Sequence, residues 1–189
     1  DSRDSALAPN SGRYQRLLGE LSLFGDARYA KANYQYQQYI PLSKQYTLAF
    51  NGEVGWGKGL GGRPFPVFKN YYAGGLGSVR GYDQSTLGPR DVTGAFIGGT
   101  RKFVLNTEFI TPFPGAGNDR TLRLFGFVDA GALYGEGEKI SGAALRYSTG
   151  VGLSWISPLG PLRFAFAIPL RKRPGDRIQR FQFQIGTSF

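Results

Sequence analysis

The sequence predicts an all-β fold, an antiparallel transmembrane β-barrel of about eight strands. Alternation of apolar and polar residues, the pattern of a strand with two different faces, recurs about eight times. Glycine (29 residues), phenylalanine (15) and tyrosine (11) are abundant, although the mean hydropathy is only -0.27. No apolar run reaches the roughly 18 residues of a transmembrane helix, whereas a membrane-spanning strand needs only about ten alternating residues.

We expect strands in eight segments, near 12–24, 27–40, 45–57, 99–111, 120–134, 143–156, 161–169 and from 181 to the C-terminus. The alternation is clearest in 161–169 and in the last segment, which ends with Phe189. In each strand one face should point to the barrel interior and the other outward. The residues expected to point outward are Phe103, Leu105, Phe109, Leu122, Leu124, Val128, Leu162, Phe164, Phe166 and Ile168.

The expected connections are of two kinds. Compact turns are predicted at 41–44, 112–119 and 157–161, and longer connections at 58–97, 135–142 and 170–179, with a short one near 25–27. An even strand number puts both termini on one side of the membrane, so the tight turns should be periplasmic and the long loops extracellular. The segment 58–97 far exceeds the roughly 12–15 residues beyond which a loop is usually functional, so we expect it to pack against the barrel.

A soluble β-sandwich has the same periodicity, and the alternation alone does not separate the two folds. Three features favour the barrel. Tyrosine and tryptophan lie near strand ends, as in the aromatic girdles of membrane barrels. The segments within 12–40 carry Gln, Asn, Lys and Arg on one face, as a watery interior requires, and the final Phe189 ends an alternating aromatic strand.

The composition argues against an enzyme, a metal site and a nucleic-acid-binding protein. The chain has no Cys and no His, and therefore lacks the commonest metal ligands and the commonest general base. The formal net charge is +10, but the basic residues fall mainly in loops and strand ends rather than along one stripe. We expect no cofactor and no nucleic acid. The connection before the last strand carries five basic residues, Arg171, Lys172, Arg173, Arg177 and Arg180. It is either a solvated loop or a surface for anionic lipid head groups.

The long segment 58–97 contains the motif Val79-Arg80-Gly81-Tyr82. Further motifs follow it in order: Gly88-Pro89, Glu108-Phe109-Ile110-Thr111-Pro112, Asp129-Ala130-Gly131, Ser157-Pro158-Leu159-Gly160-Pro161-Leu162 and Phe181-Gln182-Phe183-Gln184-Ile185-Gly186. One such motif would be weak evidence. The ordered set, which covers most of 27–189, resembles the barrels of the BamA family of bacterial outer-membrane protein insertases.

The resemblance implies that the segment 58–97 folds back into the barrel lumen, where Arg80 pairs with Glu108 and Asp129 on the inner wall. The alternation agrees with this implication. Glu108 falls on the face opposite Phe109, and Asp129 falls on the face opposite Val128. Both carboxylates should then face the lumen, where one planar guanidinium group can bridge them.

The resemblance also implies a sixteen-stranded barrel preceded by periplasmic domains, of which this chain would supply the C-terminal half of the barrel. Its first residues, Asp1-Ser2-Arg3-Asp4, are not a signal peptide, so we expect a mature protein or part of a longer one. A bilayer does not tolerate an open sheet edge. The half is therefore expected to be a fragment, to close on itself as an eight-stranded barrel, or to pair with a second copy as a homodimer.

The function implied by the resemblance is the folding and insertion of β-barrel proteins into the bacterial outer membrane. The implied partners are unfolded outer-membrane proteins, outer-membrane lipids, accessory lipoproteins and the periplasmic domains. Two alternatives stay open, a polypeptide-secretion translocator of the same superfamily and a passive pore. The last strand is implied to form one side of a lateral seam that opens toward lipid, with Phe181, Phe183, Ile185, Gly186 and Phe189, and Gly186 would weaken or kink it.

Overall fold

In the computed structural model, which describes residues 1–115, 121–158 and 160–186, eight antiparallel strands form one sheet. Their order in the sheet is β1-β2-β3-β5-β6-β7-β8-β10, so each strand pairs with its neighbours along the chain. All eight strands predicted from the alternation are present. They are β1 (Gly12–Ser22), β2 (Tyr29–Pro41), β3 (Thr47–Gly59), β5 (Arg101–Pro112), β6 (Leu122–Tyr134), β7 (Arg146–Ser157), β8 (Gly160–Pro169) and β10 (Phe181–Ile185).

Two short strands and two helical turns lie outside the main sheet. β4 (Gly81–Tyr82) pairs with β9 (Ile178–Gln179), and η1 (Val67–Lys69) and η2 (Gly142–Ala144) are short 3-10 helices. Among the described residues, no helix is long and apolar enough to cross a membrane. β4 and η1 belong to the connection between β3 and β5, residues 60–100, which we call the inner loop.

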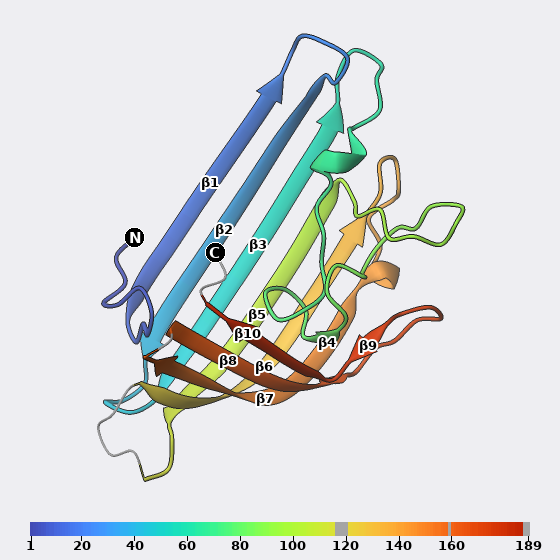
Figure 1. The fold of residues 1–189 in the computed structure, drawn as a ribbon. Coiled ribbons are helices and arrows are strands. Elements are labelled where there is room, and N and C mark those ends of the chain that lie inside the picture. The colour runs from blue at the N-terminus through green and yellow to red at the C-terminus, as the bar shows by residue number, and fades with distance from the viewer. Residues whose placement is uncertain (116–120, 159, 187–189) are drawn as a thin grey trace.

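The sheet curls into an open trough. β1, β2, β3 and β5 run side by side, while β7, β8 and β10 bend round at a steep angle to them, and the inner loop lies on the concave side (Figure 1). β1 and β10 are the two edges, and within the described part of the chain they do not pair with each other. The expected alternative of a closed eight-stranded barrel is therefore wrong. An eight-stranded barrel is filled by its own side chains, and here the inner loop occupies that space.

The bend of the sheet depends on two glycines of β7 that face the concave side. A Cβ atom at Gly150 would lie 2.1 Å from the carbonyl oxygen of Phe166 and 2.7 Å from the ring of Phe127. A Cβ atom at Gly152 would lie 2.2 Å from the ring of Phe125. The missing side chains therefore let the neighbouring strand β8 fold over β7, and they leave room for two phenylalanine rings of β6.

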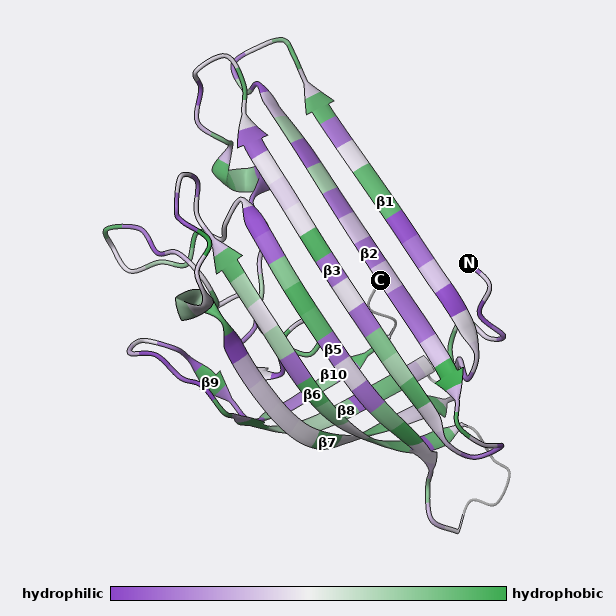
Figure 2. Ribbon diagram, turned by 180° about the vertical axis from the view of Figure 1, so that it is seen from behind, coloured by the Kyte–Doolittle hydropathy of each residue, from purple (hydrophilic) through white to green (hydrophobic). Residues whose placement is uncertain are grey.

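The outer face of the sheet is apolar and uncovered. Leu105, Val128 and Ile168 are each about half exposed, at 54%, 53% and 50%. None of the other residues predicted to point outward is buried, namely Phe103, Phe109, Leu122, Leu124, Leu162, Phe164 and Phe166. No second sheet packs on this face in the described ranges, so the sandwich is excluded, and apolar bands recur along the strands (Figure 2). An apolar surface of this kind requires a cover, and in membrane barrels that cover is lipid.

The end of the last strand differs from the expectation. β10 stops at Ile185, and Gly186 follows it with a φ of 95°, a left-handed conformation that favours glycine. Gly186 therefore lies at the end of the strand rather than inside it. The predicted aromatic terminus, Phe189, lies outside the described residues, as do parts of the predicted turns at 112–119 and 157–161.

Gly152→Ala is expected to destabilise the barrel, because the new methyl group would overlap the Phe125 ring and the Phe164 carbonyl oxygen, 2.2 and 2.4 Å away. Overpacking of this kind costs about 1–3 kcal/mol. The measurement is the free energy of unfolding of the full-length protein in urea, followed by its mobility on unheated gels. Gly126→Ala on β6 is the control, since a Cβ atom there would lie 4.0 Å from the nearest neighbouring atom, the carbonyl oxygen of Gly150. Equal stability of the two variants would contradict this account of the bend.

Candidate functional site

The inner loop is seated on glycines of β3. Gly55 and Gly57 are two residues apart, so they face the concave side together. A Cβ atom at Gly55 would lie 2.8 Å from the ring of Tyr71, and one at Gly57 would lie 2.6 Å from the ring of Phe65. The Tyr71 hydroxyl donates a hydrogen bond to the carbonyl of Ala32 at 2.6 Å. The inner face of β3 is thus a platform on which two aromatic residues of the loop are seated.

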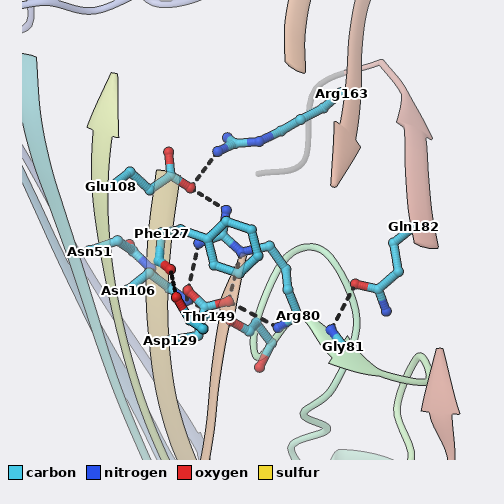
Figure 3. Close-up of polar contacts among 11 residues, drawn as sticks. Asn51, Arg80, Gly81, Asn106, Glu108, Phe127, Asp129, Thr149, Arg163 and Gln182 are labelled. Carbon is cyan, nitrogen blue, oxygen red and sulfur yellow. Dashed lines mark hydrogen bonds and ion pairs between the residues drawn. The ribbon is translucent and has the colours of Figure 1, made fainter. Parts of the chain in front are cut away.

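Arg80 is the centre of the site and is only 2% exposed. Its Nε and Nη2 donate to Oδ2 and Oδ1 of Asp129 at 2.6 and 2.5 Å, and its Nη1 donates to Oε1 of Glu108 at 2.5 Å. The backbone N–H of Arg80 also donates to Asp129 Oδ2, at 3.0 Å. These are the two partners predicted from the sequence. We call Arg80, Glu108 and Asp129 the clasp (Figure 3).

Burial makes the charge pairing of the clasp obligatory. Asp129 has no exposed surface, and an unpaired buried charge costs several kcal/mol. Glu108 is shared, because Arg163 of β8 also donates to its Oε1. Two carboxylates therefore meet two guanidinium groups, and the cluster is electrically neutral. The described residues contain no group of three or more His, Cys, Asp or Glu that could hold a metal ion.

Two phenylalanines of β6 lie beneath the guanidinium groups. Arg80 lies over the ring of Phe127, 3.7 Å from its centroid, and Arg163 lies over Phe125 at 4.3 Å. A desolvated contact between a cation and an aromatic ring contributes up to about 2 kcal/mol. Neither ring was predicted as part of the site, because only Leu122, Leu124 and Val128 among the large apolar residues of this strand were assigned to a face, the outer one. Their spacing from Asp129 was the available signal, since Phe125 and Phe127 alternate in step with it.

A row of side-chain amides holds Asp129 from the other side. Asn106 Nδ2 donates to Asp129 Oδ1 at 2.9 Å, Asn51 Nδ2 donates to Asn106 Oδ1 at 2.8 Å, and Gln35 Nε2 donates to Asn51 Oδ1 at 2.9 Å. The row crosses β2, β3, β5 and β6. Asp129 therefore accepts three hydrogen bonds from Arg80 and one from Asn106, and together these bonds fix the orientation of its carboxylate.

The motifs 79–82 and 129–131 fit each other in shape as well as in charge. Val79 is completely buried, and a Cβ atom at Gly131 would lie 2.4 Å from its Cγ2. Asp129 and Gly131 are two residues apart on β6 and face the loop together. Asp129 supplies the acceptor for Arg80, and Gly131 leaves the space for Val79.

The second half of the loop motif is fixed by close approach to the barrel wall. Gly81 has a φ of 88°, and a Cβ atom there would lie 3.1 Å from that of Ala167 on β8. The Tyr82 hydroxyl donates to the carbonyl of Arg171 at 2.5 Å and also lies 3.1 Å from that of Tyr147. Burial raises the pKa of Tyr82 to about 12, so the hydroxyl keeps its proton and stays a donor at neutral pH.

Gln182 of β10 also contacts the loop, a contact that was not predicted from the sequence. Its side chain is 4% exposed. Its Nε2 donates to the Tyr82 carbonyl at 2.7 Å. Its Oε1 accepts from the Gly81 N–H at 3.3 Å (Figure 3). The residues predicted for the lateral seam are not brought into the clasp. Phe181, Phe183 and Ile185 are exposed on the other face of β10. Gly186, which follows the strand, is also exposed, and Phe189 lies outside the described residues.

In a comparison with known protein families, the Omp85 superfamily domain matches residues 1–189. The chain belongs to the Omp85 superfamily. It is 42% identical over 216 residues to the outer membrane protein assembly factor BamA of Neisseria meningitidis, a match that covers 98% of the chain and 27% of that relative. It is also 28% identical to the sorting and assembly machinery component 50 homolog of Mus musculus, over all of the chain and 44% of that relative.

A solved relative of this Omp85 chain is the crystal structure of BamA from Haemophilus ducreyi lacking POTRA domains 1-3. It matches with a TM-score of 0.87 and 30% sequence identity, over 97% of the chain and 40% of that protein. The resemblance inferred from the motifs is confirmed, and the sheet corresponds to half of a BamA-type outer-membrane barrel. The chain spans about a quarter of its BamA relatives, 27% and 24% of their lengths.

Arg80→Lys is expected to release the inner loop while most of the barrel stays folded. One ammonium group does not reproduce a planar fork that reaches two carboxylates and stacks on a ring. Arg80→Ala removes one partner of a buried pair, which costs about 3–5 kcal/mol. Arg80→Glu should be worse still, because it places a third carboxylate beside Glu108 and Asp129. The measurement is limited proteolysis of residues 75–90 in the full-length protein.

The control for these variants is Arg90→Lys. Arg90 belongs to the same loop, but it is exposed and lies over Phe96, 4.2 Å from the ring centroid. Its replacement should leave the protection of 75–90 unchanged. Equal protease protection in wild-type and Arg80→Ala protein would contradict the clasp.

Proposed function

We propose that this Omp85 chain is the part of a bacterial outer-membrane protein assembly factor at which client β-barrel proteins fold and insert. The relatives from Neisseria meningitidis and Nitratidesulfovibrio vulgaris are named outer membrane protein assembly factors. The relatives from Mus musculus and Xenopus laevis are named for a sorting and assembly machinery. The higher identity to the bacterial protein from Neisseria meningitidis, 42% against 28% for the mouse protein, favours the bacterial outer membrane.

The observation that carries the proposal is the open edge of β10. Ala167 N–H donates to the carbonyl of Arg180 at 2.8 Å. Gly186 N–H donates to the carbonyl of Pro161 at the same distance. In an antiparallel pair these bonds recur at every second residue, so the even-numbered residues of β10 bond to β8. The odd-numbered residues direct their N–H and C=O groups to the open edge, where no described residue pairs with them: Phe181, Phe183 and Ile185.

An edge of this kind can add a strand from another protein. The client strand would then have its backbone groups hydrogen-bonded before it meets lipid, where each unsatisfied group costs several kcal/mol. β10 has five residues, whereas β2 and β3 have 13 each. A strand that pairs with β10 can therefore form only a short ladder. Such a strand is easily displaced by a client strand.

The partners in this proposal are unfolded outer-membrane proteins, outer-membrane lipids, accessory lipoproteins and periplasmic domains outside this chain. Strand pairing performs the work, without catalytic residues, a cofactor or nucleic acid. The strands that complete the barrel would come from the rest of a longer protein, and a second copy of this chain is the alternative source. A secretion translocator or a passive pore is less well supported, because the named relatives are assembly components.

Phe183→Pro is expected to impair insertion without unfolding the barrel. Proline has no N–H to offer a client, and it is tolerated on a strand edge whose N–H points away from the sheet. Losing one hydrogen bond and its neighbouring contacts should slow the insertion of a small client barrel into proteoliposomes by about fivefold to thirtyfold. Phe183→Leu keeps the N–H and an apolar side chain and should insert at the wild-type rate. Unchanged insertion by the proline variant would refute the open-edge mechanism.

A further inference from the structure

The inner loop has a second attachment, separate from the clasp, on the chain segment that forms β9 and β10. Only Arg180 separates these two strands, so residues 178–185 are one extended segment. Its first part pairs with β4 of the loop, and its second part pairs with β8 of the barrel. Asp83 N–H extends the first pairing by donating to the carbonyl of Arg177 at 2.9 Å. The same segment therefore changes partner from the loop to the barrel within a few residues.

Gln182 closes the corner where the partner changes. A side-chain amide carries a donor and an acceptor, as a peptide group does. Gln182 uses both on the loop backbone, at the carbonyl of Tyr82 and the N–H of Gly81. All these groups are buried, so separating β10 from the loop would leave them unpaired, at a cost that a solvent-exposed contact does not carry.

We propose that Gln182 is a positioning residue that couples the seat of the inner loop to the position of β10. Displacement of β10 and release of the loop are then linked events. The inference deepens the proposed function and rests on it, in that β10 is the strand offered to clients: the loop holds this short strand in place until a client pairs with it.

Coupling of this kind is reciprocal. If Gln182 transmits it, loosening the loop at Arg80 must loosen β10, and loosening β10 at Gln182 must loosen the loop. Gln182 bonds directly to Gly81 and Tyr82, so its effect on the loop is local. Among the described residues, Arg80 forms side-chain hydrogen bonds within the clasp and none with β10. Its effect on β10 is therefore the readout that separates positioning from ordinary packing.

The test is hydrogen exchange of the full-length protein in lipid nanodiscs, without client. Gln182→Leu has a similar size and lacks both polar groups. We expect amide exchange about thirtyfold faster at both 79–83 and 181–185, the factor that corresponds to losing two neutral hydrogen bonds of about 1 kcal/mol each. Exchange in β2 and β3 should not change. Arg80→Lys should accelerate exchange at 181–185 as well as in the loop, and this keeps the proposal testable if Gln182→Leu folds poorly.

Gln184→Leu is the matched control. Gln184 lies two residues further along the same face of β10 and faces Arg163 of β8 in the register, and its side chain makes no hydrogen bond to the described residues. It should behave as wild type. The coupling is overturned if Gln182→Leu accelerates only 181–185, if Gln184→Leu matches Gln182→Leu, or if Arg80→Lys leaves 181–185 unchanged. Coupled exchange together with unimpaired client insertion by Phe183→Pro would support the coupling and overturn the proposed function.

Discussion

The guanidinium group of Arg80 is the charge on which the arrangement of the inner loop depends. A loop of this length loses much conformational entropy when it is ordered, so it needs strong and specific anchors. A buried cation must be matched by carboxylates at fixed positions, and Asp129 and Glu108 supply them from β6 and β5. Arg163 adds a contact from β8 through the same Glu108. These four charged groups thus link the inner loop to β5, β6 and β8 across the concave side of the sheet.

The glycines inside the strands and the aromatic rings that face them have one explanation in this trough. A glycine inside a strand normally weakens it, because no side chain packs there. Here rings from other parts of the chain fill the vacant positions: Phe125 of the neighbouring strand β6 fills the one at Gly152, and Tyr71 of the inner loop fills the one at Gly55. The glycines therefore allow the sheet to bend and the loop to approach its backbone, and the rings restore the lost packing.

Much of this structure could be predicted from the sequence, because the alternation of side chains is a property of each strand alone. The eight strands, the apolar outer face and the inward positions of Glu108 and Asp129 follow from it. The pairing of these carboxylates with Arg80 needed the family resemblance as well, since a loop has no periodicity from which its path can be read.

The parts that could not be predicted depend on contacts without a residue-type pattern. Gln182 binds backbone groups about a hundred positions away, and a carbonyl or N–H group is the same in every residue. Phe127 was not predicted as part of the site, because a large apolar side chain usually points outward to lipid, and only the guanidinium group above it makes the inner face favourable. The open state of the sheet depends on which strand meets each edge, and the local pattern does not encode this.

The two attachments of the inner loop differ in strength, and the difference suits different roles. The clasp joins charged groups that are buried together, so removing one partner costs about 3–5 kcal/mol. Gln182 contributes two neutral hydrogen bonds of about 1 kcal/mol each. β5 and β6, which carry Glu108 and Asp129, are joined by 12 register pairs, whereas β10 is held to β8 by five. The strong attachment therefore lies on strands with a long ladder, and the weak one lies on the strand with the shortest ladder of the main sheet. A strand that must stay in place without a client and yield to one requires a link that strand exchange can break, and a neutral amide provides such a link where an ion pair would not.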